Sequence, residues 1–416
     1  MRHSHGVLPL YLDRSINFFV NEAFQFAIPA ALLITTGQPA ISAMVFGLEW
    51  VSRLLFLFLG GVVVERFGPT LSARLALLAR ALAGFGGLAA VLLFPGSPLV
   101  FEITLAVCGI LSGGLFEIGF IVNERLAANV VDSGADPDVL QSRLGSIDQV
   151  ALILGPVLGG AVLFLGVPAL FGIFGTSMAI GLAATRATAV KHQAVTQANP
   201  TLAASLAAVL DVVASRLMRV TIFGAMASNI VLATITATLA SVTQFVFHED
   251  PRAASVIVSI GGVTALVAIL LTPRITRHIG YARTLWAGIA TMVVIVAAST
   301  FAPFVWVFAV LVAVAYAGDS VVAIVSRSVR IRVFPRERYA SLMSATVLLN
   351  FLPMPFAGLS ISALVRYVGL QTTWWLAGLA ALSFGIAAFT QSRGNRSEND
   401  ADFGHSLNVL YECTPD

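Results

Sequence analysis

Apolar blocks of about 20 residues recur along the whole chain, and no other feature of the sequence constrains the fold as strongly. A helix needs about 20 apolar residues to cross the hydrocarbon core of a bilayer. Unpaired backbone groups are prohibitively costly in lipid, so such blocks have to be helices. Only 11% of the 416 residues are charged, whereas soluble proteins average about 25%. We therefore expect an all-α membrane protein.

Gly, Pro or charged residues interrupt the apolar blocks at almost every expected turn, which predicts twelve membrane-spanning helices. The longer segment after the sixth block is rich in alanine and amphipathic enough to lie on a membrane surface. We expect two pseudo-symmetric six-helix bundles at residues 1–187 and 217–391, a cytoplasmic linker at 188–216 and a disordered tail at 392–416. The expected spans lie near 10–35, 40–64, 73–95, 98–124, 142–166, 168–187, 217–247, 253–273, 283–302, 304–328, 340–367 and 370–391.

Basic residues gather in alternate loops. With the N-terminus in the cytoplasm, the inside loops hold Arg66, Arg125 and Arg277 among many others, whereas the outside loops hold only Arg252 and Arg366. This asymmetry predicts that both termini are cytoplasmic, and we expect a multi-pass protein of a bacterial inner membrane. Because the arginines lie mostly at helix ends, they indicate topology, and no nucleic-acid partner is expected.

Short motifs repeat between the two halves of the chain. Residues 61–68, after the second span, read Gly-x-x-x-Glu-Arg-x-Gly, and residues 273–280, after the eighth, form a similar turn with a charged pair and a glycine. Residues 155–159 in the fifth span read Gly-Pro-x-x-Gly, and residues 354–358 in the eleventh read Met-Pro-x-x-Gly. Matching motifs in matching spans indicate two related halves, as in many secondary transporters.

These features resemble the major facilitator superfamily over essentially the whole chain. The family's motif after the second helix, Gly-x-x-x-Asp-Arg-x-Gly-Arg-Arg, is similar to residues 61–68, with Glu65 replacing Asp and Pro69 replacing the first basic residue. Residues 155–160, Gly-Pro-Val-Leu-Gly-Gly, are similar to a fifth-helix motif found often in exporters. The resemblance implies transport by alternating access, with gating at Glu65, Arg66 and Gly68, and helix packing at Gly155, Pro156, Gly159 and Gly160.

Two further stretches resemble the ferroportin-like branch and its bacterial drug- and siderophore-exporter relatives. They are residues 10–15 with Asn21 in the first span, and Ile147-Asp148-Gln149 in the fifth. The resemblance implies that Asp148 takes part in a gating salt bridge. An acidic metal-binding position of that branch falls on Asn21 here, and all six histidines lie outside the spans or at their ends, so no metal site is expected.

Charged residues within membrane spans are costly and are functional candidates by default. Glu22, near the middle of the first span, and Asp319, near the middle of the tenth, offer one carboxylate per half for proton coupling. The structural alternatives are an interhelical ion pair for Glu22 and a bond to a residue such as Asn350 for Asp319.

Glu49 and Arg53 stand four residues apart on one face of the second span. They either bind substrate, with Arg53 receiving an anionic group, or satisfy each other structurally. The predicted substrate-binding set is Asn21, Glu49, Trp50 and Arg53.

The remaining charges are expected to form pairs. Arg80 is expected to pair with a neighbouring carboxylate, and Glu117 with Arg125 or Arg143. The gating set is completed by Arg125, Asp148 and Arg277.

The expected function is proton-coupled export of a small organic molecule, with an organic anion such as a carboxylate siderophore favoured. Multidrug efflux, uptake of a small solute, and a receptor or lipid-handling role are the alternatives. No nucleotide-binding motif and no catalytic set lies in the spans, so we expect neither an enzyme nor a cofactor. The proton gradient is the expected energy source, and the expected partners are the small-molecule substrate and the lipid bilayer around a monomer.

Overall fold

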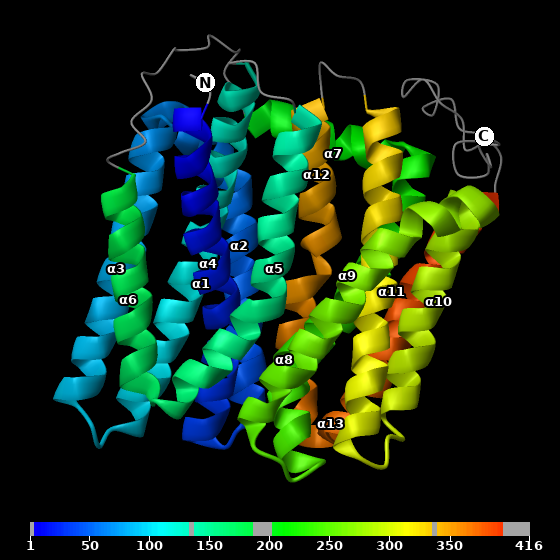
Figure 1. Ribbon diagram of the computed structural model, residues 1–416. Helices are drawn as coiled ribbons and strands as arrows, with labels where there is room; N and C mark the ends of the chain where they lie inside the picture. Colours follow the sequence, from blue (N-terminus) through cyan, green and yellow to red (C-terminus); the bar gives the residue numbers. More distant parts are fainter. Residues whose placement is uncertain (1–3, 133–136, 186–201, 335–338, 394–416) are drawn as a thin grey trace. The chain divides into compact units, whose positions relative to one another are not determined.

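The computed structural model describes residues 4–132, 137–185, 202–334 and 339–393 (Figure 1). Every regular element within these ranges is a helix. The all-α prediction is therefore confirmed for the part of the chain that is described. The helices are α1 (Ser4–Thr36), α2 (Pro39–Phe67), α3 (Pro69–Leu93), α4 (Pro98–Asp132), α5 (Pro137–Phe164), α6 (Val167–Ala184), α7 (Leu202–Ala214), α8 (Arg216–Phe245), the short η1 (Pro251–Ala253), α9 (Ala254–Ile279), α10 (Tyr281–Ser299), α11 (Val305–Val333), α12 (Tyr339–Phe351) and α13 (Pro353–Arg393).

Eleven stretches of the described chain are long and apolar enough to cross a membrane. Ten of them have 18 to 30 residues, whereas the last, Leu342–Ser392, has 51. At a rise of about 1.5 Å per residue, that stretch is roughly twice the length that one span needs. Gly369, with φ 77° and ψ 170°, breaks the helix inside it. The break lies between the expected spans at 340–367 and 370–391.

The chain divides into two compact units, residues 1–199 with 243–259, and residues 200–242 with 260–416. The first unit thus includes the end of α8 and the start of α9. In the predicted linker, residues 202–214 form α7, while residues 188–201 lie outside the described ranges. The predicted tail also lies outside them from residue 394 onward. The grouping of the helices into two six-helix bundles stays a prediction.

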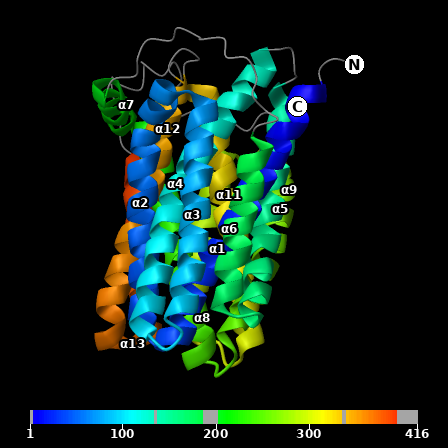
Figure 2. The same cartoon turned by 90° about the vertical axis from the view of Figure 1, so that its left-hand side faces the viewer.

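In the first unit, α1 is the central helix. It packs against α2, α4, α5 and α6, while α3 packs against α4 and α6 (Figures 1 and 2). Polar side chains on α1 are therefore surrounded by other helices on several sides. This position explains why α1 can carry Arg14, Asn17 and Asn21 almost completely buried in a chain this apolar.

Glycines bring α5 close to α1. A side chain at Gly159 would overlap the backbone oxygen of Ala23, and one at Gly155 would overlap the Cβ of Glu22. Pro156 lies inside α5, where it removes a backbone donor from the helix. Gly160, the next glycine of the motif, faces Ser255 at the start of α9. This geometry fits the helix-packing role expected for the motif, and it fixes the backbone around Glu22.

Each of the two related turn motifs ends on a glycine that starts the next helix. Gly68 (φ 77°) precedes α3, and Gly280 (φ 82°) precedes α10. Side chains other than glycine rarely adopt a positive φ, so both turns require this residue. The repeat read from the sequence therefore corresponds to a repeat in backbone conformation.

Candidate functional site

The polar residues of α1 follow the spacing of one helical face. Asp13, Asn17, Asn21 and Gln25 are each four residues apart, so their side chains lie above one another along the helix. Arg14 and Glu22 stand beside this row. The partners of these side chains come from α2, α3, α4 and α5.

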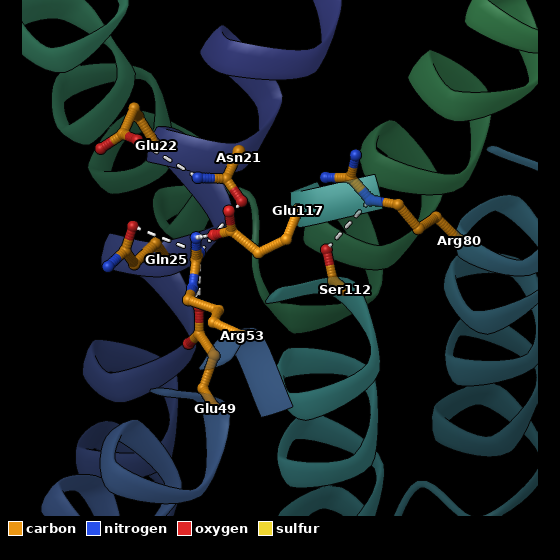
Figure 3. Close-up of polar contacts among 8 residues, drawn as sticks. All are labelled: Asn21, Glu22, Gln25, Glu49, Arg53, Arg80, Ser112 and Glu117. Atoms are coloured by element: carbon orange, nitrogen blue, oxygen red, sulfur yellow. Dashed lines mark hydrogen bonds and ion pairs between the residues drawn. The ribbon is translucent and has the colours of Figure 1, made fainter. Parts of the chain in front are cut away.

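Arg53 of α2 is the centre of a buried network of hydrogen bonds and ion pairs (Figure 3). Its Nε and Nη2 donate to Oε1 of Glu49, at 3.0 and 2.7 Å, and its Nη1 donates to Oε1 of Glu117 at 3.2 Å. Nη2 also donates to the side-chain oxygens of Asn21 (3.1 Å) and Gln25 (3.4 Å) of α1. The predicted pairing of Glu49 with Arg53 is present, and every guanidinium nitrogen of Arg53 has a protein acceptor.

Two glycines of α4 allow this network to form. A side chain at Gly113 would overlap Cγ of Glu49 and lie 3.1 Å from Nε of Arg53, and one at Gly114 would overlap the side chain of Ser52. Glu117, one helical turn later, then meets Arg53. The expected pairing of Glu117 with Arg125 or Arg143 was therefore wrong, because the close α2–α4 contact brings it to a cation from a different helix.

Trp50 is buried beside Arg53 and is not laid open as a stacking surface. Its ring centre lies 5.1 Å from the guanidinium carbon of Arg53 and 6.4 Å from the ring of Phe46. A cation over an indole ring is attracted to it, so Trp50 helps to hold Arg53 in place.

Glu22 projects from α1 next to this network. Its Oε1 accepts a hydrogen bond from Nδ2 of Asn21 at 3.2 Å (Figure 3). It forms no ion pair with any residue that the structure describes. The structural alternative for Glu22, an interhelical ion pair, is therefore absent from the described part of the chain.

Arg80 of α3 lies in a separate group of neutral partners. Its Nη1 donates to Oδ1 of Asn17 at 2.9 Å, and its Nε donates to Oγ of Ser112 at 3.3 Å. Phe174 and Phe116 lie 5.5 and 6.0 Å from its guanidinium carbon. The expectation that Arg80 pairs with a carboxylate was wrong for the described residues, because the neighbouring positions on α1 and α4 are an amide and a hydroxyl.

Arg14 joins three helices near the start of α1. It binds Asp148 of α5 through two bonds of 2.7 and 2.6 Å and Glu124 of α4 through one of 2.9 Å. The rings of Phe18 and Phe120 lie 4.3 and 5.0 Å from its guanidinium carbon. Asp148 thus takes part in a salt bridge, as expected, and its partner Arg14 belongs to the same unit, whereas the gating role of the pair stays a prediction. Sequence reasoning missed Arg14, because its partners are more than 100 residues away along the chain.

In the second unit, Asp319 of α11 accepts a hydrogen bond from Ser228 of α8, whose hydroxyl also lies 3.1 Å from the sulfur of Met292. The structural alternative for Asp319, an interhelical hydrogen-bond partner, is therefore present, but the partner is Ser228 and not Asn350. Asn350 instead accepts through its backbone oxygen from Asn229, at 2.9 Å.

The other predicted gating residues lie at helix ends. The side chain of Glu65 is outside the described part of the structure. Arg66 is exposed and lies over the ring of Phe67 at 5.8 Å. Arg125 is half-buried, and Arg277 is exposed and donates to the backbone oxygen of Pro273 at 3.3 Å. Their gating role stays a prediction.

No group of three or more His, Cys, Asp or Glu side chains suited to a metal ion occurs in the described ranges. The buried polar groups are instead arranged as arginine-centred clusters, in which carboxylates, amides and hydroxyls from different helices meet.

Many apolar helices around buried, paired charges are typical of secondary membrane transporters. A family model described as Major Facilitator Superfamily matches residues 14–358. The chain therefore belongs to the Major Facilitator Superfamily, and it is a multi-pass membrane transporter of a small molecule rather than an enzyme.

Solved structures show the same fold at low sequence identity. The nucleoside transporter NupG is 15% identical, with a TM-score of 0.73 over 93% of this chain and 99% of that one. A bacterial homologue of the iron transporter ferroportin in an inward-facing state is 16% identical (TM-score 0.71; 93% and 98% covered). A D-xylose-proton symporter is 15% identical (TM-score 0.67; 94% and 98% covered). Among curated proteins, no sequence matches this chain significantly.

Proposed function

We propose that this transporter exports a small organic molecule in exchange for protons by alternating access, with an organic anion such as a carboxylate siderophore as the favoured cargo. It acts in a bacterial inner membrane as a monomer with both termini in the cytoplasm, and it needs no cofactor. The competing cargo is a hydrophobic drug, and the competing direction is uptake.

One observation carries the proton coupling. Each unit holds a carboxylate inside a helix whose hydrogen bond comes from a neutral group, Asn21 for Glu22 and Ser228 for Asp319. Neither forms an ion pair with another described residue. Such a carboxylate can take up and release a proton without breaking a salt bridge, which suits a group that titrates when access alternates. Glu49, in contrast, is held by Arg53 at 2.7 Å.

The export direction rests on two resemblances. Residues 155–160 resemble the exporter motif, and the fold is shared with a bacterial ferroportin homologue. The D-xylose-proton symporter shares the fold as well and couples to protons in the opposite sense. The fold is thus compatible with both directions, and the motif in α5 favours export.

The proposal is tested in liposomes that contain the purified protein and an internal pH dye. The cargo panel includes a carboxylate siderophore, citrate, ferrous iron and cationic drugs. We expect one organic anion to drive proton movement in the wild type and much less in Glu22→Gln or Asp319→Asn. Glu102→Gln is the matched control, because Glu102 lies near the start of α4, outside both carboxylate sites. Cargo flux without proton movement in the wild type would show a facilitator instead.

A further inference from the structure

Arg80 is a buried cation with an incomplete set of partners. Its side chain is among the largest that are fully buried, with 1% of its surface exposed. Two of its nitrogens donate to neutral acceptors, Asn17 and Ser112, and its Nη2 has no hydrogen-bond partner in the described structure. Its guanidinium forms no ion pair with any residue that the structure describes. A buried charge in this situation costs free energy until an opposite charge meets it.

Arg53 does not have this property, although the sequence favoured it for binding an anion. Its nitrogens already contact two carboxylates, Glu49 and Glu117. A cargo anion would have to displace one of them and leave a buried carboxylate unpaired. At Arg80 an incoming anion displaces no protein carboxylate and adds a partner to a free N–H donor.

The surroundings of Arg80 keep its guanidinium in one place. Phe174 stacks on Phe24 of α1 with ring centres 4.0 Å apart, and the same Phe174 ring flanks the guanidinium. One turn after Arg80, Gly84 lies directly against the backbone of Gly175, so α3 and α6 are packed backbone to backbone at this point. A guanidinium held in this way has lost its conformational freedom before a ligand binds, and its planar donors match an oxyanion.

The guanidinium of Arg80 points toward the region where the Arg53 network lies. In Figure 3 its nitrogen atoms extend from α3 toward the side on which Glu117 and Asn21 are drawn. Asn17, which accepts a hydrogen bond from Arg80, stands one helical turn before Asn21, whose amide donates to Glu22, the proposed proton-exchanging group.

We propose that Arg80 is the cation in the N-terminal unit that binds the anionic group of the cargo, with Asn17 and Ser112 as positioning residues. The ligand class is an organic oxyanion, a carboxylate or a phosphate ester. The inference rests on the proposed function and deepens it, because it assigns the anion site to Arg80. Arg53 then has a structural role, in which it pairs with Glu49 and Glu117.

The test uses full-length protein in liposomes and compares acids with their neutral counterparts. The probes are a carboxylate siderophore and its methyl ester, citrate and trimethyl citrate, and a nucleoside monophosphate and its nucleoside. In the wild type we expect at least one acid to bind and move, and its neutral counterpart to do neither. In Arg80→Gln the apparent affinity for that acid falls about tenfold or more, since one charge-assisted contact is lost. Arg80→Lys should retain part of the affinity for the acid, because lysine keeps the positive charge but lacks the planar set of donors of a guanidinium group.

Arg283→Gln, which removes an exposed arginine at the start of α10, serves as the charge-matched control and is expected to bind the acid as the wild type does. Unchanged acid affinity in Arg80→Gln overturns the inference. The inference is also overturned if the wild-type protein binds the neutral compound of every pair more tightly than the acid, or binds the two equally. Both of these results are obtained with the wild-type protein alone, so they do not depend on whether the variants fold. Proton movement recorded in the same vesicles separates the two proposals. If acid binding depends on Arg80 but no protons move, only the proposal of proton coupling is rejected. If transport is proton-coupled but unchanged in Arg80→Gln, only the anion site at Arg80 is rejected.

Discussion

Arginine side chains organise the buried polar groups of the first unit. Arg14, Arg53 and Arg80 are each at most 4% exposed, and each bonds to side chains from at least one other helix. Removing one partner of a buried ion pair leaves an uncompensated charge, which is more costly than never having had the pair. Substitution of one of these arginines or of its partner is therefore expected to destabilise the fold as well as to affect transport.

We predict that Glu49→Gln destabilises the protein by about 3–5 kcal/mol, because Arg53 loses the negative charge of its closest partner in a buried site. The free energy of unfolding, measured by denaturant titration in mixed micelles, checks this. The triple variant Glu49→Leu, Arg53→Met and Glu117→Leu should recover much of the loss, since it removes all three charges of the cluster together. Glu102→Gln, the control, should change the value by less than about 0.5 kcal/mol.

A second prediction concerns Arg14 and Asp148. Asp148→Asn removes the negative charge from a two-bond contact, so α1 and α5 lose their strongest polar link. We expect faster labelling of a cysteine introduced on α5 near this pair, because the helix ends separate more often. Exchanging the two charges, as Arg14→Asp with Asp148→Arg, together with Glu124→Gln so that no carboxylate faces another, should restore slow labelling. Equal rates in all three proteins would show that the pair does not hold these helices together.

Some of these residues could be read from the sequence, and some could not. Glu22, Glu49, Arg53 and Asp319 are charges inside apolar blocks, and Glu49 with Arg53 shows the four-residue spacing of a helical pair. The partners of Arg80, Glu117 and Asp319 come from other helices, 32, 64 and 91 residues away along the chain. No local pattern encodes such distances, so the partners expected for Arg80 and Glu117 were wrong, and Ser228 was not foreseen as the interhelical partner of Asp319.

At the scale of helices, glycine decides which elements approach closely. Gly113 and Gly114 bring α4 to α2, Gly155 and Gly159 bring α5 to α1, and Gly84 brings α3 to α6. The motif at residues 155–160 predicted that α5 packs closely against another helix. That this helix is α1 is seen only in the structure. Small residues at such contacts let backbones meet, which is the main packing device within membranes.

We predict that Gly159→Leu lowers both the melting temperature and the transport rate, since its side chain would overlap the backbone of α1 at Ala23. The control is Gly145→Ala on the same helix, where a Cβ meets nothing within 4 Å. That control should be neutral or slightly stabilising, because alanine favours helix over glycine by up to about 1 kcal/mol. Equal melting temperatures for the two variants would contradict the close α1–α5 contact.

Gly369 supports a prediction of the same kind. Its φ of 77° breaks α13 into two helices, and a Cβ there meets no neighbouring atom, so any cost of Gly369→Ala comes from the backbone alone. We expect a loss of about 1 kcal/mol in the free energy of unfolding. Gly378→Ala, in regular helix nine residues later, should show no such loss. A rise in stability for Gly369→Ala would mean that the chain continues as one helix.

For the whole molecule, composition and block length already required an all-α membrane protein, and the motifs indicated its superfamily. Both conclusions hold for the described chain. Substrate, direction and coupling are not encoded in the same way, since one fold serves a nucleoside transporter, a metal transporter and a sugar symporter. They depend on a few buried side chains, whose contacts appear only when the helices are assembled.

The most direct test of proton-coupled export is the accumulation of the transported organic anion in liposomes under an imposed pH difference. In a proton antiporter, protons leave the acidic compartment and the cargo enters it. We therefore predict that the cargo concentrates on the acidic side, that a protonophore abolishes this accumulation, and that Glu22→Gln only equilibrates the cargo. Accumulation on the alkaline side would contradict the account, because protons and cargo would then move together, as in uptake by symport.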